Sequence, residues 1–509
     1  MSLLLLSKAF INGKWVDAAD GDVYEVCNPA NGKLIGCVPN MKVEDCRDAI
    51  VAAKCAFSSR EWSCLAAKQR ADLLKCWAIL LKQNIDDIAD IITAESGKPI
   101  TEAKQEVLCG SSVLEWFAEE ARRVYGEIIP SPKKDRELLV IKQPLGVAGL
   151  ITPWNFPLGM ITRKAGAALA TGNYEISSYL KLIILNNFCF PSPPPPGCTL
   201  VIKPSLFTPL TCLAMAKLSE EAGFPRGVIN VVTSNNARSI GEYMCKSRDI
   251  QIISFTGSTN IGKLIYRLCA DDLKRVSLEL GGNAPFIVFD SADLKKATES
   301  ALIAKFRNCG QSSIAANRFF VQDGIYDRFV ACFKQQVEDL IIGFGCSEET
   351  QIGPLINEDQ FTTICELVED ARKKNACILT GGCSVPCLGK LFYAPTIITK
   401  VPPEARIYCE EIFGPIAPII KFKTEEDVIR KANDTKSGLA AYFFTENLQQ
   451  AFRVAKRLEV GIVGINEGII SSVEAPYGGI KESGIGHECG HQGTDEYINI
   501  KSICLGNLK

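Results

Sequence analysis

The sequence predicts an α/β protein built around a parallel sheet. From Val147 onward, short apolar runs alternate with stretches of helical spacing, an order typical of βαβ units. A glycine- and serine-containing turn follows one of these runs and opens a helix, which is typical of ligand-binding loops. With 509 residues, of which 47% are hydrophobic, the chain is long enough for two or three domains with large cores.

The elements are predicted in order along the chain. Strand segments are expected around residues 10–16, and an amphipathic helix then carries Leu73, Leu74, Trp77, Leu80 and Leu81 on one face. The alternating region predicts strands at 147–151, 200–202, 228–232 and 250–255, with helices starting near Leu158, Pro209 and Ile261. Residues 173–197 interrupt this order, because connections of that length are uncommon. We predict an inserted, exposed loop away from the ligand; a proline-rich docking site is the weaker alternative.

Composition and charge exclude several classes of protein and of site. The formal charge of −2, from 56 basic and 58 acidic residues, provides no field for nucleic acid or an anionic membrane. The 22 cysteines are scattered and only two histidines, His487 and His491, are present, so we expect no metal site and a reducing compartment. The apolar start, residues 3–6, is too short for a secretory signal and not Arg-rich. We expect the cytoplasm or the mitochondrial matrix, and no membrane-spanning segment.

Four segments carry polar residues that could form a site, and three of them lie at the ends of predicted strands. Asn155 could donate to an oxyanion, although capping its own turn is the simpler interpretation. Glu279, between leucines, could be a desolvated general base or an edge-strand residue facing water. The turn with Gly257, Ser258 and Gly262 could receive phosphate or merely cap a helix. Ser313 follows a glycine bend in a loop that looks only polar by itself.

The order of short motifs along the chain resembles the aldehyde dehydrogenase superfamily. These motifs are PWNFP, KPS, FTGSTxxG, LELGGN, FRNxGQ, EEIFGP and PYGGIKESGIG. The segments ITRK (161–164), KFRN (305–308) and NEGIISSVE (466–474) are similar to the succinate-semialdehyde dehydrogenase branch in particular. The resemblance covers nearly the whole chain outside residues 173–197.

The resemblance implies a fold and an assembly. It implies an α/β, aldehyde dehydrogenase-like fold with a Rossmann-type dinucleotide-binding domain, formed by residues 1–122 and 145–281 with the inserted loop. An α/β catalytic domain would span 282–482. A small oligomerisation β-flap would combine 123–144 with 483–509, and homodimers or homotetramers are expected.

The resemblance also implies a reaction and the residues that carry it. A thiolate attacks an aldehyde in this family, while Asn155 and a backbone amide would hold the oxyanion and Glu279 would activate water. Hydride passes to NAD or NADP. Arg163, Arg307 and Ser471 match positions that bind the substrate's distal carboxylate, which implies succinate semialdehyde.

The resemblance places further residues around the dinucleotide. Lys203 and Glu411 would reach ribose hydroxyls. NAD-preferring relatives often carry a glutamate three residues after that lysine, where this chain has Leu206, so repulsion of a 2′-phosphate is absent and NADP is permitted. The full cofactor set is Thr152, Pro153, Trp154, Lys203, Ser205, Gly257, Ser258, Gly262, Leu280, Glu411 and Phe413.

One departure from the family concerns the nucleophile. The chain reads FRNCGQSS, so Ser313 stands where the family has cysteine. A hydroxyl needs a strong adjacent base, whereas a thiol is partly ionised at neutral pH, so we expect impaired turnover or, alternatively, a catalytically silent dinucleotide-binding protein or assembly partner. Cys309 is expected to be a packed small residue. A serine hydrolase is disfavoured because His487 and His491 lie far along the chain from Ser313.

Overall fold

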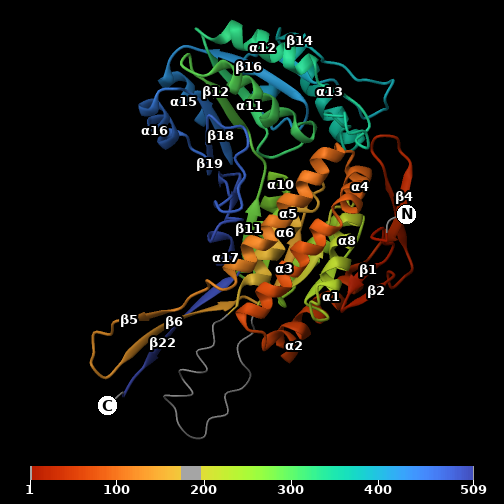
Figure 1. Ribbon diagram of the computed structural model, residues 1–509, viewed down its shortest axis with the longest axis vertical. Helices are drawn as coiled ribbons and strands as arrows, with labels where there is room; N and C mark the ends of the chain where they lie inside the picture. Colours follow the sequence, from red (N-terminus) through yellow and green to blue (C-terminus); the bar gives the residue numbers. More distant parts are fainter. Residues whose placement is uncertain (1–2, 173–196, 508–509) are drawn as a thin grey trace.

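A computed structural model describes residues 3–172 and 197–507 (Figure 1). Its largest sheet has eight strands, of which β9, β8, β7, β10 and β11 are mutually parallel. The strands in spatial order are β2 (Lys14–Val16), β1 (Ala9–Ile11), β9 (Ile229–Val231), β8 (Thr199–Lys203), β7 (Val147–Ile151), β10 (Ile250–Thr256), β11 (Arg275–Glu279) and β21 (Gly484–Ile485).

The strand order creates a switch point in the middle of this sheet. The chain runs outward from β7 through β8 to β9 on one side, and then through β10 to β11 on the other. In such doubly wound sheets, ligands bind beyond the carboxyl ends of the strands at the switch point. Ile151 pairs with Lys203 and with Phe255, so the ends of β7, β8 and β10 lie at one level.

Helices cover this sheet, and their buried faces match the predicted periodicity. In α3 (Ala67–Gln83), Leu74, Trp77 and Leu81 are buried, and the Trp77 indole donates to the Met215 carbonyl. The predicted helix near Pro209 begins at that residue, where a fixed φ favours helix initiation. The remaining helices around the sheet are α1 (Val43–Ser58), α4 (Ile85–Ser96), α5 (Ile100–Glu120), α6 (Gly159–Ala170), α8 (Pro209–Glu221), α9 (Ala237–Lys246) and α10 (Thr259–Ala270).

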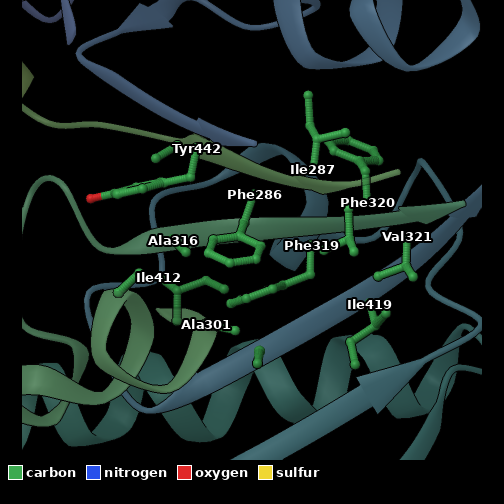
Figure 2. Close-up of a cluster of buried hydrophobic side chains, with 14 of the residues drawn as sticks. Phe286, Ile287, Ala301, Ala316, Phe319, Phe320, Val321, Ile412, Ile419 and Tyr442 are labelled. Atoms are coloured by element: carbon green, nitrogen blue, oxygen red, sulfur yellow. The ribbon is translucent and has the colours of Figure 1, made fainter. Parts of the chain in front are cut away.

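A second, seven-stranded sheet is parallel except at its β14 edge. Its core is aromatic: Figure 2 shows Phe286, Phe319 and Tyr442 packed together, and the Phe286 and Phe319 ring centroids are 5.1 Å apart. The strands in spatial order are β14 (Cys377–Thr380), β15 (Thr396–Thr399), β16 (Ile416–Phe422), β13 (Ala316–Gln322), β12 (Ala284–Val288), β18 (Ala440–Phe444) and β19 (Ile462–Ile465). The helices of this part include α11 (Leu294–Phe306), α12 (Tyr326–Glu338), α13 (Glu358–Lys373), α15 (Glu425–Asn433) and α16 (Leu448–Arg457).

A third, antiparallel sheet projects from the body of the molecule (Figure 1). It joins β5 (Glu127–Ile129) and β6 (Glu137–Pro144) to the C-terminal strand β22 (Ile498–Leu505). Residues far apart in sequence are therefore paired, for example Ile498 with Pro144. The C-terminal region contributes in a second way, because β21 extends the eight-stranded sheet beside β11.

The predicted α/β fold with strands at 147–151, 200–202, 228–232 and 250–255 is confirmed within one or two residues at each end. The domain boundaries proposed from the sequence remain predictions. The predicted insertion lies outside the described residues except for Gly197. Among the residues described, no helix has both the length and the hydropathy to cross a membrane.

Candidate active site

The switch point gathers several of the predicted residues. Thr152 follows β7 directly, Lys203 ends β8, Ser258 follows β10, and Glu279 ends β11. Thr256 pairs with Glu279, which places the turn after β10 beside that carboxylate. These residues therefore share the edge of the sheet at which an α/β protein binds its ligand.

Asn155 connects the two large sheets. Its side-chain nitrogen donates to the Gln311 carbonyl at 3.0 Å, while its side-chain oxygen accepts from the Phe156 amide at 3.1 Å. The interpretation of Asn155 as a turn cap is therefore only partly right. Its side chain accepts from the neighbouring Phe156 amide, but it also donates to the Gln311 carbonyl. Its carbonyl accepts bonds from Asn308 Nδ2 at 3.0 Å and Lys98 Nζ at 2.8 Å. The Asn155 backbone and side chain are therefore both fixed.

A buried ion pair lies beneath this loop. Lys98 contacts Glu106, and both side chains are almost fully buried. Glu106 also accepts from the amides of Leu158 and Gly159 at 2.9 and 3.1 Å, at the start of α6. A carboxylate satisfies the free amides at a helix N-terminus and interacts favourably with the helix dipole. Sequence reasoning missed this pair, which fixes both the loop and the helix.

Glu279 is buried, with 2% of its surface exposed, which excludes the interpretation as an edge residue facing water. Neither carboxylate oxygen has a hydrogen-bond partner among the described residues. Burial raises the pKa of Glu279 well above its usual value and nearby Glu488 raises it further, whereas Lys164 and Arg163 lower it. A buried carboxyl group with free oxygens and a raised pKa has the properties expected of a general base.

Sequence reasoning missed two charged residues next to Glu279. Lys164 and Glu488 form a buried ion pair across 324 positions of the chain. Arg163 Nη1 lies 3.9 Å from the second Glu488 oxygen. Lys164 directly follows Arg163 in a motif that had been noted, but nothing local identified Glu488 as its partner. The pair places two opposite charges beside the Glu279 carboxylate.

Ser313 is held by an unusual backbone path. Asn308, Cys309 and Gly310 in η1 (Arg307–Gly310) all have positive φ, at 52°, 56° and 72°. Non-glycine residues with positive φ are strained and often mark functional sites. Cys309 is buried, which agrees with its prediction as a packed residue, and burial raises the pKa of its thiol. The predicted glycine bend before Ser313 is thus present, and its positive φ angles begin two residues earlier, at Asn308.

Glycines make room for this turn. A Cβ atom on Gly282 would lie 2.1 Å from the Ser313 carbonyl oxygen, and one on Gly281 would lie 2.5 Å from Glu411 Oε2. The Gly282 amide donates to Glu411 Oε1 at 2.9 Å. The LELGGN motif therefore lets Ser313 and Glu411 approach the same stretch of backbone.

The turn after β10 suits a ligand better than a simple cap. Ser258 is the N-cap of α10, yet its side chain makes no capping hydrogen bond. Thr152 also has a buried hydroxyl without a partner among the residues described. A Cβ on Gly262 would come within 2.3 Å of Leu280, so this glycine allows α10 to pack closely there. Free hydroxyls beside a helix N-terminus can receive phosphate.

The other predicted cofactor residues surround the same edge. Lys203 is buried and donates to the Pro204 carbonyl at 3.0 Å, and burial lowers its pKa to about 8. Burial raises the pKa of Glu411 to about 7. Ser205 instead accepts from the Phe207 amide at 3.3 Å in a local turn.

Two aromatic residues join the sheets across this edge. The Trp154 and Phe413 rings meet edge to face with centroids 5.6 Å apart, and Pro153 immediately precedes Trp154. Phe413 has a positive φ of 52°, and its carbonyl accepts from Gln360 Nε2 at 3.0 Å. The strained backbone holds the ring against Trp154, between the two sheets.

The predicted carboxylate-binding residues are only partly together. Arg163 Nη2 donates to Ser471 Oγ at 2.6 Å, and Arg163 Nη1 has no hydrogen-bond partner among the described residues. The Arg163 side chain is only 14% exposed, so Arg163 is not a solvated charge on the surface of its helix. Arg307 lies over the Phe156 ring, with its guanidinium carbon 5.4 Å from the ring centroid.

Comparison with known proteins agrees with this geometry. The aldehyde dehydrogenase family model matches residues 15–177 and 196–503. The chain belongs to the aldehyde dehydrogenase family. It is similar to succinate-semialdehyde dehydrogenase [NADP(+)] GabD of Escherichia coli (strain K12), 48% identical over 99% of both chains. It is also similar to mitochondrial succinate-semialdehyde dehydrogenase of Oryza sativa subsp. japonica, 48% identical over 99% of this chain and 90% of that one. A crystal structure of an E. coli NADP-dependent enzyme, 48% identical, covers 99% of this chain and 98% of its own with a TM-score of 0.92.

Membership of the aldehyde dehydrogenase family supports an oxidoreductase. The comparisons do not bear out the expectation of a serine nucleophile with impaired turnover, nor that of a silent protein. Cys198 is buried, at the amino end of β8, where it contacts Thr171 and the Tyr497 carbonyl. This is the edge of the sheet opposite to Asn155 and Glu279.

The glycine that faces Ser313 provides a test of this site. We expect Gly282→Ala to lower the free energy of unfolding by about 1–3 kcal/mol, because its Cβ would overlap the Ser313 carbonyl oxygen. Dinucleotide affinity, measured by calorimetry, should fall, because the overlap would displace the residue 282 amide that donates to Glu411. Gly241→Ala is the matched control, since a Cβ there meets nothing within 4 Å. If the two variants had the same free energy of unfolding and the same dinucleotide affinity, the close approach of Gly282 to the Ser313 carbonyl would be unimportant.

Proposed function

We propose that the protein oxidises succinate semialdehyde to succinate with NAD or NADP. The aldehyde carbon loses hydride to the dinucleotide and gains an oxygen atom from water, and protons are released as the carboxylate forms. The observation that carries this proposal is the buried Arg163 guanidinium, which is bonded to Ser471 yet keeps one nitrogen free. A buried guanidinium nitrogen without a hydrogen-bond partner favours a substrate with a second, negatively charged end.

The residues near Ser313 suit the two halves of this reaction. Asn155 would donate its amide to the substrate oxygen, which becomes negative when the carbonyl carbon is attacked. Water would attack that carbon, and the resulting hydrate would lose hydride to the dinucleotide. Glu279 would take a proton from the attacking water, as its free, buried oxygens allow. Arg307, over Phe156, would add a second positive charge toward the substrate.

The edge of the eight-stranded sheet fits a dinucleotide. The free hydroxyl groups of Thr152 and Ser258, the Lys203 amine and the Glu411 carboxylate would bind its phosphate and ribose groups. A bound dinucleotide would supply the ring that accepts hydride from the aldehyde carbon. Leu206 has no carboxylate that would repel the 2′-phosphate of NADP, so both NAD and NADP are compatible with this edge. We place the protein in the cytoplasm or the mitochondrial matrix, in keeping with its bacterial and mitochondrial relatives.

Exchange of the side chain at position 313 tests the reaction. We expect the unaltered protein to form NADH or NADPH steadily from succinate semialdehyde, and Ser313→Cys to raise kcat, because a thiol ionises more readily than a hydroxyl. The gain should not exceed about 10⁶, the loss seen when a nucleophile is removed from another enzyme. Ser312→Cys is the matched control and should leave kcat unchanged. The proposal fails if both the unaltered protein and Ser313→Cys fold and bind dinucleotide yet form no product.

Removal of the Arg163 charge tests the proposed site for the substrate's carboxylate. Arg163→Met should raise the KM for succinate semialdehyde by about 10- to 100-fold, because a charge-assisted hydrogen bond contributes about 1.5–3 kcal/mol. Butanal has the same carbon chain without the carboxylate, so its kcat/KM should change little. A similar loss for both aldehydes would mean that Arg163 does not recognise the carboxylate.

We also propose that two or four copies associate through the antiparallel sheet. Ile128 and Ile500 on this sheet are 75% and 72% exposed, and an exposed strand edge favours pairing with another chain. Ile128→Lys with Ile500→Lys should yield monomers in light scattering after size exclusion. Leu448→Lys, at an exposed position of α16, is the control and should keep the assembly intact. An unchanged mass in the double variant would exclude this surface.

A further inference from the structure

Tyr477 packs its ring against the guanidinium group of Arg163. The guanidinium carbon of Arg163 lies 4.4 Å from the centre of that ring, and Tyr477 is 6% exposed. The Tyr477 backbone is also held, because its amide and carbonyl exchange hydrogen bonds of 2.7 Å with the carbonyl and amide of Glu488. The face of an aromatic ring attracts a cation most strongly where water is excluded. Tyr477 therefore provides a fixed surface for the buried cation.

Arg163 also faces a negative charge. Arg163 Nη1 lies 3.9 Å from Glu488 Oε2, which is close enough for an ion pair but too long for a hydrogen bond. Neither atom has a hydrogen-bond partner among the described residues, and the two side chains are only 14% and 3% exposed. Opposite charges attract each other strongly where little water is present, so the guanidinium group needs a restraint to stay at this separation. Closure of the gap would use the nitrogen that is proposed to bind the substrate's carboxylate.

Two contacts provide this restraint. Arg163 Nη2 donates to Ser471 Oγ at 2.6 Å, and the ring of Tyr477 lies against the guanidinium carbon. Tyr477 and Glu488 form an antiparallel backbone bridge, so the position of the ring relative to Glu488 is fixed as well. An aromatic face attracts a cation without occupying its N–H groups. The ring can therefore hold Arg163 in place and leave Nη1 available.

We propose that Tyr477 is a positioning residue that determines specificity: its ring keeps the Arg163 guanidinium from closing on Glu488, so that Nη1 stays available for the carboxylate at the far end of the substrate. The inference rests on the proposed function, because that function assigns Arg163 to this carboxylate. It deepens the function by naming the contact that keeps the cation available. Tyr477 itself takes no part in making or breaking bonds.

Removal of the ring tests this proposal by kinetics. Tyr477→Leu should raise the KM for succinate semialdehyde about 10-fold with kcat nearly unchanged, because the carboxylate must then compete with Glu488 for Arg163. The kcat/KM for butanal, which has no carboxylate, should change by about twofold or less. Tyr477→Phe retains the ring and should keep both values. Tyr393→Leu is the matched control, because Tyr393 is also buried but packs on Phe361, and it should leave the preference between the two aldehydes unchanged.

Three kinetic results would overturn the proposal. An equal loss for both aldehydes in Tyr477→Leu would mean that the ring only fills space in the site. An unchanged KM for succinate semialdehyde would mean that Arg163 needs no restraint from the ring. A loss in Tyr477→Phe as large as that in Tyr477→Leu would assign the effect to the hydroxyl group. If Tyr477→Leu does not fold, Tyr477→Met is measured against the same criteria, because methionine fills irregular spaces in a core.

A second test does not require turnover. Calorimetry with succinate measures recognition of the carboxylate directly, and Tyr477→Leu should weaken succinate binding about 10-fold, whereas Tyr477→Phe and Tyr393→Leu should not. Equal affinity in Tyr477→Leu and the unaltered protein, together with a loss in Arg163→Met, would overturn this inference alone. Equal affinity in the unaltered protein and Arg163→Met would overturn the carboxylate site as well. The expected loss in a protein that forms no product would support Tyr477 and contradict the proposed function.

Discussion

The position of the active site depends on the buried ion pair between Lys98 and Glu106. Transfer of two charges from water to the interior is costly unless each charge finds further partners. Here Lys98 also donates to the Asn155 carbonyl, and Glu106 also accepts two amides at the start of α6. The pair therefore fixes the loop that carries Asn155 and the helix that carries Arg163. Loss of either partner would leave a buried charge and release both elements.

A second set of charges determines how Glu279 can act. Glu279 and Glu488 repel each other, while Lys164 and Arg163 oppose that repulsion. Because the pKa of Glu279 is raised in the folded protein, its folded state holds a proton more tightly than its unfolded state. The stability that Glu279 contributes is therefore present at low pH. It is lost as the pH rises from the ordinary pKa of a carboxyl group to the pKa that Glu279 has in the folded protein. At neutral pH, the buried Glu279 carboxylate therefore lowers the free energy of unfolding.

Local sequence patterns predicted the sheet around the site well. The strand at residues 147–151 and the helix start at Pro209 agree with the structure, since apolar alternation and proline geometry act over a few residues. The charges beneath the site could not be predicted in this way. Lys98 and Glu488 look like ordinary surface residues locally, and only long-range folding buries them beside Glu106 and Lys164. Strand β21 was missed for the same reason, because its partner β11 is about 200 residues away along the chain.

The backbone, more than the side chain, determines where residue 313 lies. The preceding turn has positive φ angles from Asn308 to Gly310, and the Gln311 carbonyl that follows it accepts from the side-chain nitrogens of Asn155 and Asn308. Gly282 lets the Ser313 carbonyl approach a neighbouring strand. None of these contacts uses the side chain of residue 313, so a change of its terminal atom alters chemistry while geometry is kept.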